Sequence, residues 1–370
     1  GSYTAVATGM GGDVKVQVTF SSTAITAIKV LSHNETPGVG DVAVKTLPGK
    51  IVSAQSLNVD GVAGATISSK AIFAAVEECV KKAGGDVEAL KAKKAVAQAR
   101  AADVVQTADV VIIGAGGAGL AAAVTANQAG ASVIVLEKMP KVGGNTIISG
   151  AAYNSSDPER QAKTAAAAGP EATVMALINA KSASELHAQM QAQLKKEYEA
   201  YKASGSASLF DSPTLHALQT YEGGDRVGDL VLIKNFTANT LSGVKWLESL
   251  GMKFGDTCFT VLGALWQRSH KPVKPLGTGY IDAYMDYLNG HKVPIMLETK
   301  AGKILMKDGK AVGVEATGPS GNKVTLYARK GVILATGGFA RNIEMRQQYN
   351  KHWKTLDASI MSTNHPGATG

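Results

Sequence analysis

The chain has 370 residues, which is enough for two or three domains with at least one large hydrophobic core. Hydrophobic residues make up 45% and charged residues 18%, proportions that exclude general disorder. The net charge of +8 suits anionic ligands, but the lysines are scattered and no basic block alternates with aromatic residues, so no nucleic acid partner is expected. The most apolar segment, residues 110–126, is interrupted by glycines, so no membrane span is expected either.

The pattern of residues 1–82 predicts a small α+β domain. Residues 13–20 alternate between apolar and polar side chains, as in a half-buried strand, and residues 24–33 predict a second strand. Residues 68–82 carry apolar side chains at helical spacing and predict a helix. The Ala- and Lys-rich residues 83–107 predict a short helix and a linker.

A different pattern begins the second domain, which is expected over residues 108–370. A continuous β-branched run at 108–113 predicts a strand buried on both faces. A helix at 117–129 and a second buried strand at 132–138 are expected to follow. This βαβ unit predicts an α/β fold with a parallel sheet.

The rest of the second domain is expected to contain helices first and strands later. Residues 159–202 are rich in Ala, Gln, Lys and Glu and predict helix, and residues 231–250 predict another helix. Strands are expected from residue 294 onward, including a hairpin turned at Asp308 and Gly309.

The two cysteines, Cys79 and Cys258, are far apart, and each lies among apolar residues. We expect both to be buried free thiols. No CxxC or CxxCH motif and no His/Cys cluster is present, so neither a metal site nor a c-type haem is expected.

Residues 114–119 read GAGGAG, a GxGxxG motif directly after a predicted strand and at the start of a helix. Gly114 allows a tight turn, Gly116 lets the backbone approach a pyrophosphate, and Gly119 allows close packing of helix on strand. Glu137 ends the next strand, where its carboxylate can accept hydrogen bonds from ribose hydroxyls. A glycine-rich turn without a nucleotide is the alternative, but the full strand, turn, helix and strand context favours dinucleotide binding.

Two further segments, residues 137–154 and 331–342, favour FAD over NAD. The order GAGGAG, EK…GGNT, RxH, ATGGF and TNHPGATG resembles the FAD-binding family of fumarate reductases, succinate dehydrogenase flavoproteins and L-aspartate oxidases. The resemblance implies a Rossmann-like FAD-binding domain with a glutathione-reductase-like βαβ core. The residues that it implies in FAD binding lie in the glycine-rich loops, at the end of the second strand and in the ATGG segment: Gly114, Gly116, Ala118, Gly119, Glu137, Lys138, Gly144, Asn145, Thr146, Gly150, Ala151, Thr336 and Gly337.

The stretch DGVAGATISSK at residues 60–70 places three hydroxyls in four positions. A P-loop is excluded, because GxxxxGK[ST] is not satisfied. One interpretation is a helix N-cap supplied by Thr66 or Ser68. Another is a resemblance to the FMN-binding domains of flavoproteins and of sodium-pumping quinone reductase subunits. In those domains a flavin transferase joins FMN through a phosphoester bond to the threonine of an Asp-x-x-(Ser/Thr/Ala)-Gly-Ala-Thr motif.

Asp60 and the Gly-Ala-Thr that ends at Thr66 match this motif, while Ala63 stands where Ser or Thr is common. The small residues leave room for a transferase, and for phosphate against the amides at a helix start. We therefore expect a small α+β FMN-binding domain with covalent FMN at Thr66 and with Ser68 as the helix cap.

Within the FAD family the chain looks most like the soluble reductases of α,β-unsaturated carboxylates, the fumarate and urocanate reductase group. VLGALWQRSHKP resembles the segment in which fumarate reductases carry a Gly-Ala…Arg-x-His pattern, here with Arg268 and His270. These two residues either form a surface pair or line the flavin pocket, and Trp266 either packs in the core or suits an aromatic substrate. Urocanate is the expected substrate, with fumarate and acrylate- or cinnamate-type acids as alternatives.

The resemblance implies that an external donor, a reduced cytochrome or similar carrier, passes electrons through FMN to FAD. FAD then gives a hydride to the β-carbon of the acid. A flavin transferase is a second implied partner. The catalytic residues, including an arginine acid, are expected beyond Gly370, so the second domain is expected to be truncated before its capping domain.

Two functions of other classes stay open. The chain is alternatively a flavin-carrying electron-transfer module whose catalytic half lies on a missing or separate segment, or an NAD-dependent dehydrogenase that binds no flavin. Relatives with this layout are often periplasmic, and a basic chain without an initiating Met fits an exported form, so a periplasmic location is expected. The Gly-Ser start fits a vector scar equally well, which leaves a cytoplasmic location open.

Overall fold

The structure is a computed structural model that describes residues 1–36, 40–62, 65–93, 100–164, 170–350, 364–365 and 367–370. It divides into two compact units. The first comprises Gly1–Ile148 and Tyr284–Gly370, and the second comprises Ser149–Ala283. Within the described residues, no helix is both long enough and apolar enough to cross a membrane.

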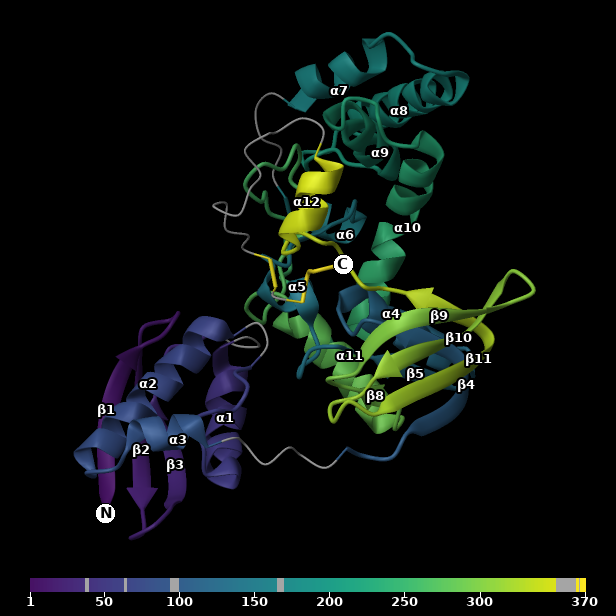
Figure 1. The fold of residues 1–370 in the computed structure, drawn as a ribbon. Coiled ribbons are helices and arrows are strands. Elements are labelled where there is room, and N and C mark those ends of the chain that lie inside the picture. The colour runs from purple at the N-terminus through teal and green to yellow at the C-terminus, as the bar shows by residue number, and fades with distance from the viewer. Residues whose placement is uncertain (37–39, 63–64, 94–99, 165–169, 351–363, 366) are drawn as a thin grey trace. The chain divides into compact units, whose positions relative to one another are not determined.

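The N-terminal part of the first unit is a three-stranded antiparallel sheet with helices packed against it (Figure 1). Its elements in chain order are β1 (Ser2–Thr8), β2 (Asp13–Phe20), β3 (Ile25–Ser32), α1 (Gly40–Ala54), α2 (Thr66–Lys82) and α3 (Val87–Ala92). Alternation along β2 buries Val14, Val16 and Val18 completely and leaves Lys15 exposed. The predicted strands at β2 and β3 and the helices at α2 and α3 are confirmed.

Two elements of this part, β1 and α1, were not predicted from the sequence. Helix α1 contains Pro48 followed by Gly49, and both are poor helix formers, so the local signal for a helix is weak. The helix nevertheless forms, with Leu47 and Ile51 fully buried one turn apart in the core against the sheet. Tertiary packing therefore outweighs local propensity here.

The second part of the first unit is built around a six-stranded sheet in the order β8-β5-β4-β11-β10-β9. Strands β8, β5, β4 and β11 run parallel, and β10 and β9 extend the sheet antiparallel. The elements of this part are β4 (Val104–Ile113), α4 (Gly117–Gln128), β5 (Val133–Leu136), α5 (Gly144–Ile148), β8 (Ile295–Met296), β9 (Lys300–Lys307), β10 (Lys310–Thr317), β11 (Lys323–Leu334) and α12 (Ile343–Tyr349). The predicted βαβ unit is β4, α4 and β5, so the α/β prediction is confirmed.

Details of this sheet agree with the sequence in one place and differ in another. The hairpin between β9 and β10 turns at Asp308 and Gly309, whose φ angles are +49° and +74°, as predicted. Strand β4 begins at Val104, inside the segment predicted as a linker. It extends there because Val104 pairs with Val324 of β11, a partner far away in the sequence.

The second unit is mainly helical. Its elements are β6 (Tyr153–Asn154), α6 (Pro158–Gln161), α7 (Pro170–Asn179), α8 (Glu185–Ala203), α9 (Pro213–Gly223), α10 (Leu230–Ser249) and β7 (Ser269–His270), and α11 (Thr278–Gly290) begins in this unit. The predicted helix at 231–250 is confirmed as α10. The helical region predicted over 159–202 is divided, because Ser184 starts α8 afresh by accepting a hydrogen bond from the His187 amide.

Both cysteines are buried free thiols, as predicted. Cys79 has no exposed surface and packs in the core of the N-terminal part. Cys258 is 3% exposed, and burial raises the pKa of its thiol to about 12. Neither side chain is therefore poised to react as a thiolate.

The approach of α4 to the turn after β4 leaves no room for a side chain at Gly119. A Cβ atom there would lie 1.8 Å from the carbonyl oxygen of Gly114, so Gly119→Ala forces the backbone apart. We expect a loss of stability of about 1–3 kcal/mol, measured as a lower midpoint of thermal unfolding. Gly331→Ala is the control, because no atom lies within 4 Å of its Cβ position. Equal midpoints for the two variants would contradict close packing at Gly119.

Candidate functional site: a dinucleotide groove and a hydroxyl loop

A cavity of about 450 Å³ lies at the carboxyl ends of the parallel strands in the first unit. Strands β4, β5 and β11 end at Ile113, Leu136 and Leu334, and all three residues line the cavity. This edge of a parallel sheet is where α/β proteins bind their ligands. Most of the residues predicted for FAD line the cavity: Gly114, Gly116, Ala118, Glu137, Lys138, Gly144, Asn145, Thr146, Thr336 and Gly337.

The glycine turn after β4 forms the floor of this groove. Gly114 has a φ angle of +105°, and a Cβ atom there would lie 2.4 Å from the carbonyl oxygen of Ala335, just after β11. Gly116 caps α4 and has no side chain to bind the amides of the first helical turn, which begin at the groove. Gly119 does not line the cavity and instead has the packing role predicted for it.

The GGNT loop is held against the glycine turn by hydrogen bonds from backbone amides. The Gly143 amide donates to the Ala115 carbonyl at 2.8 Å, and the Gly117 amide donates to Thr146 Oγ1 at 3.1 Å. Asn145 ties the loop to the end of the chain, since its Oδ1 accepts from the His365 amide at 2.6 Å. The two loops therefore form one continuous wall of small residues and backbone groups.

Glu137 is fixed in place by the backbone around it. One carboxylate oxygen accepts from the Ala115 amide at 2.9 Å and the other accepts from the Met139 amide at 2.8 Å. Each carboxylate oxygen can accept more than one hydrogen bond, so Glu137 keeps capacity for ribose hydroxyls. The neighbouring Lys138 donates to Thr369 at 2.7 Å, and burial lowers the pKa of its ammonium group.

The groove also contains residues that the sequence analysis missed. Thr299 lines it from just before β9, Lys300 and Ala301 line it from the first two positions of β9, and His365, Gly367 and Ala368 line it from the end of the chain. The first group follows another parallel strand, so the rule that ligands sit at the carboxyl ends of such strands could have found it. Gly150 and Ala151 belong to the second unit, and their role in FAD binding stays a prediction.

The hydroxyl loop, residues 60–70, runs into the first turn of α2, and only one of its three hydroxyl residues is exposed. Thr66 is the first residue of the helix and faces solvent. Ser68 is 2% exposed and donates to Glu35 Oε2 at 2.5 Å, and Ser69 is 3% exposed and accepts from the Val62 amide at 3.0 Å.

Ser68 is thus not the helix cap, and that prediction is wrong. The N-cap position is Ala65, whose side chain makes no cap hydrogen bond, so the cap residue supplies no side-chain oxygen to the first amides of α2. Ser69, one residue further on, is the hydroxyl that holds the loop backbone. Two residues of the proposed motif, Ala63 and Gly64, lie outside the described residues.

The surface-pair interpretation of Arg268 and His270 is also wrong, because they are 3% and 0% exposed. Both side chains are buried in the second unit, whereas the residues that line the groove belong to the first. A role for them in lining the flavin pocket stays a prediction.

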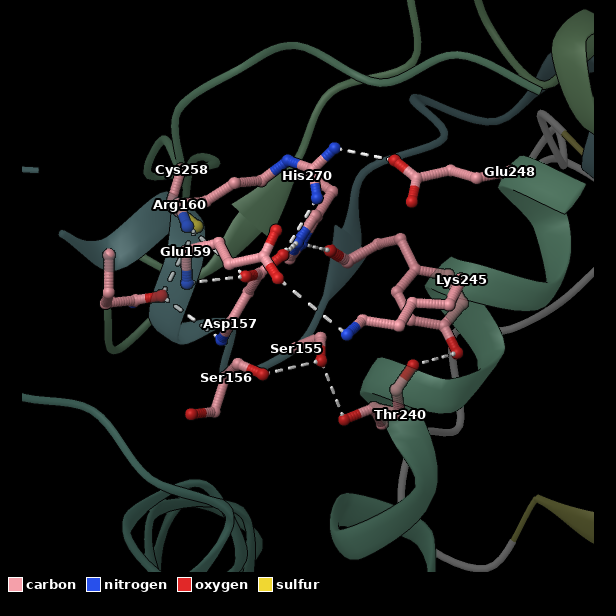
Figure 2. Close-up of polar contacts among 12 residues, drawn as sticks. Ser155, Ser156, Asp157, Glu159, Arg160, Thr240, Lys245, Glu248, Cys258 and His270 are labelled. Carbon is pink, nitrogen blue, oxygen red and sulfur yellow. Dashed lines mark hydrogen bonds and ion pairs between the residues drawn. The ribbon is translucent and has the colours of Figure 1, made fainter. Parts of the chain in front are cut away.

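His270 belongs to a chain of polar contacts that continues through Asp157 and Arg160 to Glu248, which Figure 2 shows. Its Nδ1 lies 3.1 Å from the Tyr153 carbonyl and its Nε2 lies 3.0 Å from Asp157 Oδ2. Arg160 donates to the same Asp157 oxygen at 2.8 Å and to Glu248 at 2.6 Å. Burial acts to raise the pKa of Asp157, but the hydrogen bonds from His270 and Arg160 outweigh it and hold that pKa below its usual value.

Arg268 forms a second buried pair. Its Nη2 donates to Asp211 Oδ1 at 2.8 Å and to Gln219 Oε1 at 2.6 Å. Burial raises the pKa of Asp211 to about 7, although the Arg268 charge opposes the shift. Trp266 packs in the core of the second unit and donates its indole N–H to the Phe210 carbonyl at 2.9 Å.

The Arg268–Asp211 pair predicts a large difference between two substitutions. Asp211→Asn leaves Arg268 as a buried cation without its counter-ion, and we expect it to cost about 3–5 kcal/mol of stability. Asp282→Asn breaks the exposed Lys274–Asp282 pair and should cost about 1 kcal/mol or less. Urea denaturation followed by circular dichroism compares the two variants. If Asp211→Asn lowers the free energy of unfolding no more than Asp282→Asn does, the buried pair does not stabilise the fold as we expect.

Comparison with known protein families gives two matches, one in the N-terminal part of the chain and one in the rest. Residues 9–81 match the FMN-binding domain, and residues 109–366 match the FAD dependent oxidoreductase domain. The chain is 26% identical to a flavocytochrome c3 fumarate reductase solved in an open conformation, with a TM-score of 0.54 over 71% of this chain and 39% of that one.

Two curated relatives match along the whole chain. The NADH:acrylate oxidoreductase of Vibrio harveyi is 36% identical over 100% of this chain and 38% of its own length. The urocanate reductase of Eggerthella lenta is 33% identical over 100% of this chain and 54% of its own length. The chain thus spans about two fifths to one half of these relatives. The match to the FAD dependent oxidoreductase family covers more than half of this chain, so the chain belongs to that family. An FMN-binding domain precedes the FAD dependent oxidoreductase domain.

Proposed function

We propose that this chain is the flavin-binding part of a reductase that acts on α,β-unsaturated carboxylates. The observation that carries the proposal is the presence in one chain of an FMN-binding domain and an FAD dependent oxidoreductase domain. Two relatives that match along the whole chain are named for the reduction or oxidoreduction of such acids. When bound, FMN would carry electrons to FAD, and reduced FAD would supply a hydride for the β-carbon of the acid.

The residues of the groove fit FAD in chemistry as well as in position. The amides at the start of α4 would hold the pyrophosphate, because a helix N-terminus favours negative charge. Glu137, held by two backbone amides, would accept hydrogen bonds from the adenosine ribose. Thr336 and Gly337, after β11, close the opposite wall.

Thr66 is the residue that we propose to carry FMN. Of the three hydroxyls in its loop, those of Ser68 and Ser69 are buried and engaged, while Thr66 is exposed at the first position of α2. A flavin transferase would therefore reach Thr66 alone, and the uncapped amides of α2 would favour the phosphate that it attaches.

For the substrate we propose an acrylate-type monocarboxylate, with urocanate and fumarate as the alternatives. Urocanate was expected partly because Trp266 suits an aromatic substrate. Trp266 is 8% exposed and its N–H is bound to Phe210, so it offers little support for that choice. Among the relatives matched along the whole chain, the higher identity belongs to the one named for acrylate.

The proposed partners are a flavin transferase and an external electron donor. The names of related proteins mention NADH in two cases and cytochrome in others, so both kinds of donor fit the proposal. The periplasmic location suggested by the sequence remains part of this proposal.

The attachment site is tested by the mass of the intact protein after expression with a flavin transferase. We expect wild type to gain the mass of FMN less one water, and Thr66→Val to gain nothing. Ser68→Ala is the matched control, because that hydroxyl is buried on Glu35, and it should carry FMN like wild type. FMN on the Thr66→Val protein, or its loss in the Ser68→Ala protein alone, would place the attachment elsewhere.

The substrate is tested by anaerobic oxidation of the reduced, flavin-loaded full-length protein. Acrylate, urocanate and fumarate are added in parallel, and flavin absorbance is followed with time. We expect acrylate to reoxidise the flavin fastest. If urocanate or fumarate reoxidises the flavin faster, that acid is the substrate instead of acrylate. If none of the acids reoxidises the flavin, the result favours an electron-transfer module.

A further inference from the structure

The second unit contains a small cavity that the proposed function does not use. It has a volume of about 150 Å³, and we call it the Arg268 pocket. It is lined by polar Asn154, His216, Gln219, Thr220 and Arg268 and by apolar Ala264, Leu265 and Trp266. Liquid water occupies about 30 Å³ per molecule, so the pocket has room for a small organic molecule.

Three of its polar side chains carry buried atoms with no hydrogen-bond partner among the described residues. These atoms are Arg268 Nε, Gln219 Nε2 and His216 Nδ1, and their residues are only 3%, 4% and 7% exposed. Gln219 Oε1 accepts from Arg268 Nη2, so the amide is oriented with its NH₂ group as the free end. A buried donor without an acceptor costs about 1–3 kcal/mol, which is a strong reason to expect a ligand or ordered water here.

The charge around the pocket favours an anion. Arg268 supplies a positive charge, and no carboxylate is among the lining residues. Asp211, the counter-ion of Arg268, is bound at Nη2 and leaves Nε free. Burial, together with the Arg268 charge, lowers the pKa of His216 to about 3, so this imidazole is neutral at physiological pH.

Apart from Thr220, whose hydroxyl donates to the His216 carbonyl, the remaining wall is apolar. It is formed by Ala264, Leu265 and Trp266, and Leu265 is 61% exposed. A ligand with an anionic end that accepts hydrogen bonds and a short apolar chain would match both kinds of wall. Guanidinium groups pair with carboxylates in just this way, through directed N–H donors.

We propose that the Arg268 pocket binds the carboxylate group of a small monocarboxylic acid, with Arg268 and Gln219 as the donors. Asn154, whose Oδ1 accepts from Ser269, contributes a third donor through its amide nitrogen. The pocket lies wholly within the second unit, so this binding does not depend on flavin or on turnover.

The proposal is tested by NMR titration of the full-length protein, with the Trp266 indole N–H as the reporter. Trp266→Phe assigns that resonance among the three tryptophans. We expect propionate to shift it saturably, and propionamide, a neutral molecule of the same shape, to leave it unchanged. An equal shift with propionamide or with sodium chloride, or no shift with propionate, would overturn the proposal.

A second arm replaces one donor by an acceptor. Gln219→Glu keeps the oxygen that accepts from Arg268 but puts a negative charge in the pocket, so we expect propionate to bind at least ten-fold more weakly. Gln106→Glu adds the same charge at an exposed position of β4 and should bind like wild type. Unchanged affinity in Gln219→Glu would overturn the proposal.

Asn154→Asp provides the same test if Gln219→Glu does not fold, since it too keeps its acceptor oxygen and loses a donor. It should weaken binding of propionate in the same direction, and an affinity equal to that of wild type would overturn the assignment. Reductase activity is not measured in any arm. Failure of the proposed flavin chemistry and failure of this pocket are therefore separate results.

Discussion

The nucleotide groove depends on one close backbone contact, between the turn after β4 and the first turn of α4. The Gly114 carbonyl occupies the space that a side chain at Gly119 would need, and the carbonyl of Ala335 occupies the space next to Gly114. Strand β4, helix α4 and the end of β11 therefore meet without side chains between them. Their backbone amides form the floor of the groove, which is the surface that a pyrophosphate requires.

In the hydroxyl loop, two of the three hydroxyl groups are buried and hydrogen-bonded, which leaves one at the surface. Ser68 and Ser69 are drawn into the domain by Glu35 and by the Val62 amide, and only Thr66 stays at the surface. Ala65, the cap residue of α2, supplies no side-chain oxygen to the amides that begin the helix. Of the three hydroxyls, that of Thr66 is therefore the one exposed at the start of α2.

The parts of the site that could be predicted from the sequence are those whose chemistry is local. The glycine turn and Glu137 lie within one βαβ unit, so residue spacing was enough to place them. The errors concern partners that are distant in sequence. Ser68 was assigned as a cap because its buried acceptor, Glu35, lies 33 residues away, and Arg268 was open to a surface interpretation because Asp211 lies 57 residues away. Helix α1 was missed for a similar reason, since the packing that stabilises it is tertiary.

Arg268 and His270 of the RxH segment differ in how completely their nitrogens are hydrogen-bonded. Both ring nitrogens of His270 contact protein oxygens, and its partner Asp157 also accepts from Arg160. His270 therefore has no ring nitrogen left for a ligand. Arg268 uses Nη2 for both Asp211 and Gln219 and leaves Nε without a partner among the described residues.

A cation that is paired at one end and unsatisfied at the other is stable enough to be buried, yet it retains capacity for a ligand. His270, with both nitrogens engaged, has no such reserve. Of the two residues, Arg268 is therefore the one whose surroundings favour recognition of a small acid, while the ring nitrogens of His270 are taken up by Tyr153 and Asp157.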